Sequence, residues 1–255
     1  MSDKKQFVLL AGASGYLGSF LYNKLNRDYL ITSLVHNKGS FHKNVFSLDL
    51  TKLKDIKKFV EKVEKYDALI FLVGLAHKKG NSKEILDFRS INTQSLIYLL
   101  SALKEKKKSP NKIIFASTIS VYGEKRNLNI YREDSDLNPF SPYAITKLET
   151  EKFLLKNYSE KTWILRFAPV YSPKLRLNID RRTKLGNYFF KAGNGDNKLS
   201  LCNMENIGLV VQAILEEKVP ADTYNISDKV EYTYNNLLNK ADTNLIIPIP
   251  ILFLK

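Results

Sequence analysis

Residues 7–18 read FVLLAGASGYLG, an apolar run followed by three glycines, Gly12, Gly15 and Gly18, spaced three residues apart. The apolar run predicts a strand that is buried on both faces, and the amphipathic stretch from about Tyr16 to Asn26 predicts a helix. The glycines therefore stand where a strand turns into a helix. Glycine at such a junction allows a tight turn, a close approach of the backbone to a pyrophosphate, and close packing of the helix on the strand. The position of the glycines predicts phosphate binding at the N-terminus of the helix.

Beyond this stretch, short apolar runs alternate with helix-length amphipathic stretches. Strands are predicted at 30–35, 44–48, 68–73, 112–116 and 162–167, and helices at 53–65, 90–106 and 143–157. Continuous apolar strands separated by helices indicate a parallel sheet covered on both faces. We therefore expect an α/β fold with a Rossmann-type doubly wound parallel sheet, whose ligands bind beyond the C-terminal ends of the strands.

The alternation becomes irregular after Pro169. We therefore expect a dinucleotide-binding domain over residues 1–168 and a small C-terminal substrate-binding lobe over residues 169–255. Truncation of this lobe, and interleaving of the lobe with the first domain, are both left open.

Composition restricts the class of protein. Of the 255 residues 44% are hydrophobic, enough for a sizeable core, and the longest apolar run, Ala68 to Ala76, is far shorter than the ~20 residues of a membrane span. The N-terminus lacks the layout of a signal peptide. One cysteine, Cys202, cannot form an internal disulfide, and three isolated histidines do not suggest a metal site. We expect a soluble, cytoplasmic protein with no metal and no membrane partner.

The formal net charge of +14 raises the question of a nucleic-acid partner. Only eight of the 40 basic residues are arginine, the residue that grips phosphates and base edges, and the lysines are scattered along the whole chain. A solvated basic surface explains this distribution, so we expect no specific nucleic-acid partner.

The ends of the second and third predicted strands bear on which dinucleotide is bound. Residues 34–38, LVHNK, carry no carboxylate for the ribose hydroxyls, and neutral or basic groups such as His36 tolerate a 2′-phosphate. NADP is therefore modestly favoured over NAD. Asp49 is a candidate acceptor for the adenine amino group, although the role of an ordinary turn residue explains it equally well.

Residues 141–147, SPYAITK, place Tyr143 and Lys147 one helical turn apart on the same face. A phenol has an ordinary pKa of ~10. A neighbouring ammonium and the positive charge of an oxidised nicotinamide are expected to lower that pKa, so that proton exchange with a sugar hydroxyl or carbonyl becomes feasible. Residues 115–123, FASTISVYG, put Thr118 at the C-terminal end of the fifth predicted strand, where its hydroxyl would polarise the reacting oxygen. The two segments are expected to converge where such folds bind ligand.

Together with Asn92, FLVGLA at 71–76 and LRFAPVYSP at 165–173, these motifs resemble the extended short-chain dehydrogenase/reductases. More narrowly, the chain resembles the NAD-dependent epimerase/dehydratase family, similar to UDP-glucose 4-epimerases, from residue 7 to about residue 228. The resemblance implies a catalytic triad of Thr118, Tyr143 and Lys147 acting on a nucleotide-sugar substrate.

The resemblance also implies the residues that bind ligands. For the cofactor, NADP or NAD, they are Gly12, Ser14, Gly15, Tyr16, Leu17, Gly18, His36, Asp49, Leu50, Gly74, Leu75, Ala76, Asn92, Tyr143, Lys147 and Pro169. For the substrate they are Thr118, Ser120, Tyr143, Asn178 and Arg182.

Departures from the family pattern reduce the number of reactions that we expect. Family dehydratases carry two carboxylates after the threonine of the fifth strand, whereas this chain has Ile119 and Ser120, so loss of water is disfavoured. Hydride transfer at C4 of a nucleotide-diphosphate sugar remains. Val35 stands where epimerases usually carry an acid, which slightly favours a 4-keto reductase over a 4-epimerase. The resemblance further implies surface-polysaccharide synthesis and a homodimer.

The alternative function is a non-catalytic, dinucleotide-sensing or nucleic-acid-binding regulator on the same fold. Such proteins commonly lose the Tyr/Lys pair, which is present here.

Overall fold

In the computed structural model, residues 5–36, 44–75, 81–123, 130–239 and 246–249 are described. The chain forms two compact units. The first comprises residues 1–166 and 210–225, and the second comprises residues 167–209 and 226–255. The chain thus leaves the first unit and returns to it, so neither unit is one continuous stretch of sequence.

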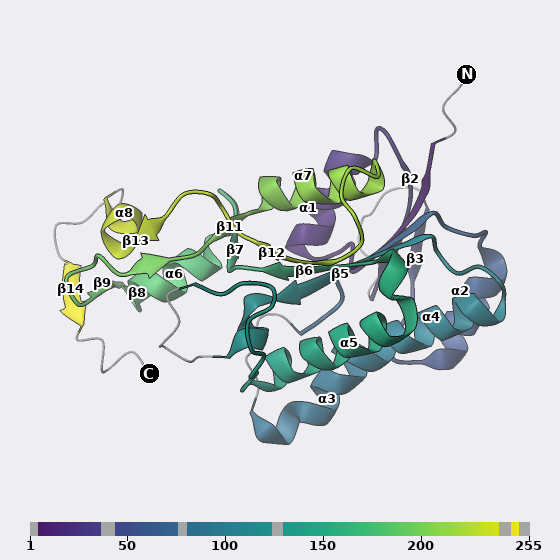
Figure 1. Cartoon of the computed structure of the whole chain (residues 1–255), viewed down its shortest axis with the longest axis horizontal. Coiled ribbons are helices and arrows are strands. Elements are labelled where there is room, and N and C mark those ends of the chain that lie inside the picture. The colour runs from purple at the N-terminus through teal and green to yellow at the C-terminus, as the bar shows by residue number, and fades with distance from the viewer. Residues whose placement is uncertain (1–4, 37–43, 76–80, 124–129, 240–245, 250–255) are drawn as a thin grey trace. The chain divides into compact units, whose positions relative to one another are not determined.

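A seven-stranded sheet with the order β12-β6-β5-β4-β1-β2-β3 forms the centre of the first unit (Figure 1). Its strands are β1 (Phe7–Ala11), β2 (Leu30–Val35), β3 (Val45–Ser47), β4 (Ala68–Phe71), β5 (Lys112–Thr118), β6 (Thr162–Phe167) and β12 (Thr223–Ile226). The pairs β1–β2, β2–β3, β1–β4 and β4–β5 are parallel. Strand order reverses between β1 and β4, which is where doubly wound sheets open a crevice for ligand. The predicted Rossmann-type fold is confirmed.

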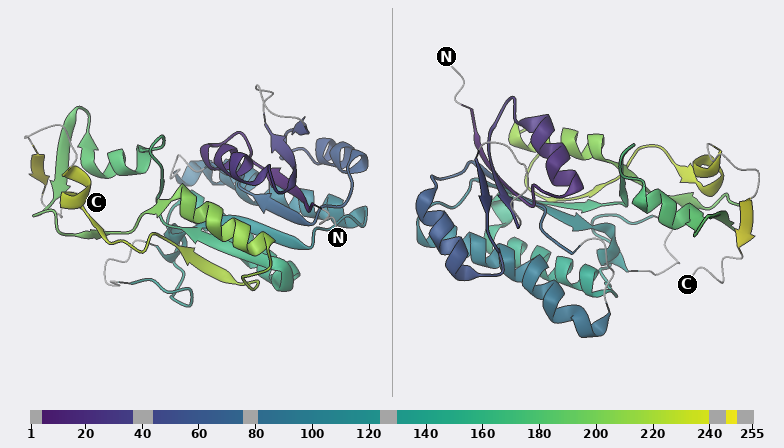
Figure 2. Two further views of the ribbon diagram at one scale, coloured as in Figure 1. Left: turned by 90° about the horizontal axis from the view of Figure 1, so that it is seen from above. Right: turned by 180° about the vertical axis from the view of Figure 1, so that it is seen from behind.

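Helices cover both faces of this sheet, with α1 on one face and α2, α4 and α5 on the other (Figure 1, and from behind in Figure 2). The helices are α1 (Tyr16–Leu25), α2 (Leu53–Lys62), α3 (Ile85–Arg89), α4 (Ser95–Glu105), α5 (Pro142–Tyr158) and α7 (Met204–Leu215). One π-helical turn, Ser90–Gln94, joins α3 to α4, and short 3-10 turns lie at Ser82–Glu84, Ile119–Tyr122 and Ser159–Lys161.

The core of the first unit forms between the sheet and these helices because the central strands carry apolar residues in unbroken runs. Leu9, Leu69, Ile113 and Phe115 are fully buried and belong to one cluster that includes the apolar stripes of α2 and α4. Each such side chain contributes roughly 1.5–3 kcal/mol on removal from water. This packing holds the C-terminal ends of the adjacent strands β5, β4 and β1 side by side.

The second unit consists of short elements. They are β7 (Val170–Tyr171), α6 (Leu177–Thr183), β8 (Lys184–Leu185), β9 (Tyr188–Ala192), β10 (Lys198–Leu199), β11 (Cys202–Asn203), β13 (Tyr232–Thr233), α8 (Tyr234–Leu238) and β14 (Ile246–Ile249). They form three small sheets, β10-β13, β11-β7 and β14-β9-β8. None of the helices in the described ranges has both the length and the apolar character needed to cross a membrane.

Candidate active site

The glycine turn joins β1 to α1 with little room to spare. Gly12 has a φ of +87°, in the left-handed region that favours glycine, and its N–H donates to the carbonyl oxygen of Leu34 at 3.1 Å. A Cβ on Gly18 would lie 2.2 Å from the carbonyl oxygen of Gly12 and 2.7 Å from the Cα of Ala13. Gly15 is less crowded, since a Cβ there would meet nothing closer than 3.5 Å. Close packing of α1 on the turn therefore depends on Gly18.

The N-terminus of α1 has the features of an anion site. Gly15 is its N-cap residue, no side chain in the described ranges caps it, and its first turn contains no acidic residue. Its first backbone N–H groups have no partner within the helix and carry the positive end of the helix dipole. Ser14 and Tyr16 are exposed beside them, and Leu17 is half-buried. This end of the helix fits the pyrophosphate of a dinucleotide.

At the ends of β2 and β3 the predicted cofactor residues lie in turns. His36 is exposed and its carbonyl oxygen accepts from Ser47 Oγ at 3.1 Å, whereas residues 37–43 lie outside the described ranges. Asp49 Oδ1 accepts from both the side chain and the N–H of Thr51, at 2.7 and 2.9 Å. These two bonds hold the pKa of Asp49 below its ordinary value, and the bond from the Thr51 side chain has the larger effect. Without a cofactor, Asp49 thus stabilises the turn at Thr51, and its binding of adenine stays a prediction.

A pocket of about 390 Å³ opens beside this turn. Its lining consists of Thr51, Leu75, Glu84, Asp87, Phe88, Ser90 and Ile91. Leu75 is itself a predicted cofactor residue, and the pocket also lies next to two others, Leu50, which is buried, and Gly74. The wall from α3 was not predicted, because the sequence pattern there indicated only a helix from residue 90.

Thr118, Tyr143 and Lys147 come together at the C-terminal end of β5. Thr118 is the last residue of β5, and its hydroxyl lies close enough to that of Tyr143, in the first turn of α5, to lower the pKa of the phenol. Lys147, one turn later, donates from Nζ to the carbonyl oxygen of Ala116 at 2.8 Å. Its Nζ lies 5.9 Å from the centroid of the Tyr143 ring. Ser120 is exposed, and its backbone N–H donates to Thr118 Oγ1 at 3.2 Å.

Burial controls the titration of this group of side chains. Desolvation raises the pKa of Tyr143 to about 12, although the hydrogen bond with Thr118 opposes the rise. Desolvation lowers the pKa of Lys147 to about 8, against the negative charge of Glu151. In the protein without cofactor the pKa of the phenol is therefore raised, and its lowering by the ammonium together with an oxidised nicotinamide stays a prediction. Lys147 is turned toward Ala116 and the Phe115 ring, 4.8 Å away, so burial of the phenol outweighs it.

Asn92, in the π-helical turn, is hydrogen-bonded to two segments of the site. Its Oδ1 accepts from the N–H of Leu75 at 2.8 Å, and its Nδ2 donates to Thr146 Oγ1 at 2.9 Å. A Cβ on Gly74 would lie 3.1 Å from Asn92 Oδ1 and 3.2 Å from Lys147 Nζ. Asn92 therefore joins the segment after β4 to α5 next to the catalytic candidates. Ala76, a predicted cofactor residue, lies outside the described ranges.

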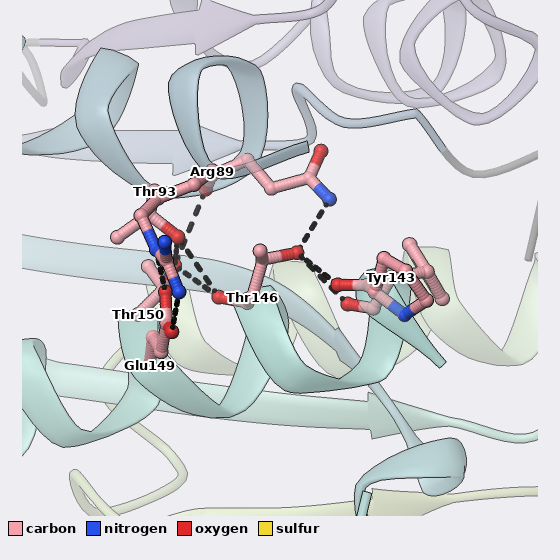
Figure 3. Close-up of polar contacts among 8 residues, drawn as sticks. Arg89, Thr93, Tyr143, Thr146, Glu149 and Thr150 are labelled. Carbon is pink, nitrogen blue, oxygen red and sulfur yellow. Dashed lines mark hydrogen bonds and ion pairs between the residues drawn. The ribbon is translucent and has the colours of Figure 1, made fainter. Parts of the chain in front are cut away.

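Further contacts hold α5 against α3 and the π-helical turn (Figure 3). Thr150 Oγ1 bonds with Thr93 Oγ1 at 3.0 Å, and Arg89 makes a two-pronged ion pair with Glu149 at 2.9 and 2.6 Å. Each contact lies one turn or more beyond Tyr143 along α5 (Figure 3). These contacts hold the part of α5 that directly follows Tyr143 and Lys147.

A buried ion pair that the sequence analysis missed lies next to the site. Arg166 of β6 and Glu151 of α5 are 3% and 1% exposed and are joined by an Nη2–Oε2 contact of 2.8 Å. A signal was available, since an arginine inside the apolar strand sequence TWILRF must find a partner when it is buried.

In the second unit, the predicted substrate residues Asn178 and Arg182 both lie on α6. Asn178 Nδ2 donates to the carbonyl oxygen of Val170 at 2.8 Å, and Arg182 Nη1 donates to that of Asn178 at 2.7 Å. Both side chains are half-buried, as is Pro169 before β7. Cys202 is buried, which raises the pKa of its thiol to about 12 and fits an inert side chain.

Comparison with known proteins agrees with this geometry. Residues 8–227 match the sequence profile of the NAD dependent epimerase/dehydratase family. The "Uncharacterized UDP-glucose epimerase YtcB" of Bacillus subtilis is 31% identical over 190 residues, which cover 66% of this chain. The chain spans 58% of the length of that relative.

A second relative is the N-acetyl-alpha-D-glucosaminyl-diphospho-ditrans,octacis-undecaprenol 4-epimerase of Escherichia coli O157:H7. It is 25% identical over 97% of this chain and 75% of its own length. Among solved structures, Bordetella bronchiseptica WbmG in complex with NAD superimposes with a TM-score of 0.77 at 18% identity, over 98% of this chain and 83% of its own. The profile match spans most of the sequence, and the chain therefore belongs to the NAD-dependent epimerase/dehydratase family.

Proposed function

We propose that the protein is an NAD(P)-dependent enzyme that transfers hydride at C4 of a nucleotide-diphosphate sugar. The observation that carries the proposal is the meeting of Thr118, Tyr143 and Lys147 at the end of β5. Because β1, β4 and β5 are parallel neighbours, this group lies on the same sheet edge as the glycine turn. A phenol, an ammonium and a hydroxyl at that edge suit proton exchange with a sugar oxygen.

The glycine turn and the uncapped N-terminus of α1 fit a nicotinamide dinucleotide, with Gly12, Gly15 and Gly18 against its pyrophosphate. When bound, that cofactor supplies the acceptor and the donor of the hydride. Asp49 and the pocket beside Thr51 and Leu75 support an adenine position at the ends of β3 and β4. The absence of an acid at Val35 supports NADP, whereas the family favours NAD.

Tyr143 exchanges the proton of the C4 hydroxyl in this proposal. Its phenol is protonated at neutral pH, because burial holds its pKa at about 12, and it is therefore ready to donate to a C4 carbonyl. To accept a proton it needs added positive charge, from Lys147 and from an oxidised nicotinamide nearby. Thr118 hydrogen-bonds the phenol and orients the same sugar oxygen.

Two reactions share this chemistry. The 4-keto reductase is supported by Val35 alone, and the 4-epimerase by the names of the Bacillus and Escherichia coli relatives, so we place 4-epimerisation first. Ile119 and Ser120, in place of two carboxylates, argue against dehydration. The lipid-linked sugar in the name of the Escherichia coli relative supports a role in surface-polysaccharide synthesis.

We assign substrate binding to the second unit, residues 167–209 and 226–255. Asn178 and Arg182 on α6 are its candidates for the substrate diphosphate, since a guanidinium binds phosphate oxygens in a planar fork. A homodimer is proposed on the family resemblance alone.

The test is incubation of the purified protein with a panel of UDP- and dTDP-sugars and their 4-keto forms, with NAD or NADPH. Sugar stereochemistry is followed by proton NMR and NADPH by absorbance. Inversion at C4 without net cofactor consumption identifies the epimerase, and stoichiometric NADPH oxidation identifies the reductase. Cofactor binding without turnover of any sugar would favour the regulator instead.

A further inference from the structure

Three consecutive residues at the end of β5 each hold a successive turn of α5. The Thr118 hydroxyl lies beside that of Tyr143, the Ala116 carbonyl oxygen accepts from Lys147 at 2.8 Å, and Ser117 Oγ donates to the Glu151 carboxylate. The three helix residues are spaced four apart and therefore share one face. The first two turns carry the proposed proton-transfer groups, so the third, Glu151, needs an explanation.

Glu151 is a carboxylate with almost no access to water. Besides Ser117 Oγ, it accepts from Arg166 Nε at 3.2 Å and from Nη2 at 2.8 Å. The remaining nitrogen of Arg166, Nη1, donates to the hydroxyl of Tyr122 at 2.8 Å and to the carbonyl oxygen of Glu133 at 3.1 Å. Each guanidinium nitrogen is thus hydrogen-bonded, so no donor of Arg166 is left buried without an acceptor.

Lys147, unlike Glu151, is a buried side chain, 2% exposed, without a salt-bridge partner among the described residues. Its neighbours are the carbonyl oxygens of Ala116 and Val73, at 2.8 and 3.5 Å, and the faces of two aromatic rings. Burial of this kind favours the neutral amine. Glu151, one turn away, opposes that loss of charge.

We propose that Glu151 is a positioning residue of the active site, which seats α5 on the end of β5 through Ser117 and places a negative charge one helical turn from the Lys147 ammonium. Its role in turnover rests on the proposed function, whereas its effect on Lys147 is a property of the protein alone. Arg166 holds the Glu151 carboxylate in place through two hydrogen bonds, and so acts on the site only through Glu151.

The charges around this group are few. Lys147 faces the phenol of Tyr143 and the carboxylate of Glu151, from its own helix, and neutral groups of β5. Glu151 faces Lys147, Arg166 and the neutral Ser117. Loss of the Glu151 carboxylate would therefore remove the negative charge that opposes the neutral form of Lys147.

The experiment follows the Lys147 Cε resonance by NMR in full-length protein labelled at lysine Cε, with the signal assigned by its absence in Lys147→Arg. The wild-type titration midpoint is expected near pH 8. Glu151→Gln keeps the shape of the side chain and is expected to lower the midpoint by roughly one pH unit. The double variant Glu151→Leu/Arg166→Met removes the pair without leaving a buried charge, and it is expected to lower the midpoint as well.

Glu149→Gln is the matched control, because Glu149 also lies on α5 and also pairs with an arginine, Arg89, but at the surface. It should leave the Lys147 midpoint unchanged. A midpoint that stays near pH 8 in both Glu151 variants overturns the proposal, whatever the activity. With a sugar substrate, a one-unit fall would leave about a tenth of Lys147 protonated at pH 8 in place of about half, and lower kcat about fivefold with KM retained. If the midpoint moves and no sugar is turned over, the proposed function fails and the effect of Glu151 on Lys147 remains.

Discussion

Substitution of Gly18 by alanine tests how the glycine turn is packed. The added Cβ would lie 2.2 Å from the carbonyl oxygen of Gly12, about 1.2 Å short of the 3.4 Å at which ordinary contact begins. The atoms it meets are backbone atoms of Gly12 and Ala13, which cannot rotate away as a side chain would. Helix α1 must therefore move away from the turn, or the turn must open.

Overpacking of this kind costs about 1–3 kcal/mol. In a chain of this size each kcal/mol lowers the melting temperature by ~2–4 °C, so we expect Tm to fall by roughly 2–12 °C. Movement of α1 also displaces the N–H groups that would face the pyrophosphate. Loss of one hydrogen bond to a charged group corresponds to a roughly 10–100-fold weaker affinity for the dinucleotide.

The assay is thermal unfolding by circular dichroism together with calorimetric titration of NAD and NADP. Gly15→Ala is the matched control, because its φ of −73° suits alanine and its Cβ would meet nothing closer than 3.5 Å. Its stability should change by less than about 1 kcal/mol. A Gly18→Ala variant with wild-type Tm and affinity would refute the packing argument.

Two further predictions concern pH and cofactor choice. Turnover should fall as pH rises through about 8, where Lys147 loses its proton. Deprotonation of Lys147 should not destabilise the fold over that range. The pKa of this group is 10.5 when unfolded, so the unfolded chain binds the proton more tightly and the contribution of Lys147 to stability increases with pH between these values. A kcat profile from pH 6.5 to 9.5 with circular dichroism at each point measures both, and constant kcat up to pH 9.5 would show that the ammonium is not needed. NADPH should bind more tightly than NADH in a fluorescence titration, and a clear preference for NADH would remove the argument from Val35.

Sequence reasoning succeeded where local pattern and tertiary position agree. The strands Phe7–Ala11, Leu30–Val35 and Thr162–Phe167 lie as predicted, because continuous apolar runs are buried on both faces of a parallel sheet. It failed where the pattern of apolar residues does not distinguish one type of secondary structure from another. The helix predicted from residue 90 begins as α4 only at Ser95, since apolar periodicity does not reveal a π-helical turn. The seventh strand, Thr223–Ile226, is too polar and short for such a run, and only the resemblance of residues 224–228 to a strand of the family pointed to it.

The candidate site was predictable in its residues and less so in its electrostatics. The spacing of Tyr143 and Lys147 gives their common face, and the end of β5 gives Thr118. Depth of burial is a property of the whole fold, however, and it raises the pKa of the phenol in the protein without cofactor, which the spacing of residues does not reveal. The partnership of Glu151 with Arg166 likewise depends on α5 lying against β6, which spacing alone does not reveal.

The most direct test of the account compares the wild-type protein with Tyr143→Phe, a change that removes one oxygen and keeps the ring. C4 stereochemistry of the UDP-sugars and 4-keto sugars that the wild type converts is followed by NMR, and NAD(H) and NADP(H) affinity by calorimetry. The account predicts that Tyr143→Phe loses turnover by at least ~10²-fold, the range of a lost general acid–base group, and keeps its cofactor affinity. Turnover at the wild-type rate by Tyr143→Phe would contradict it.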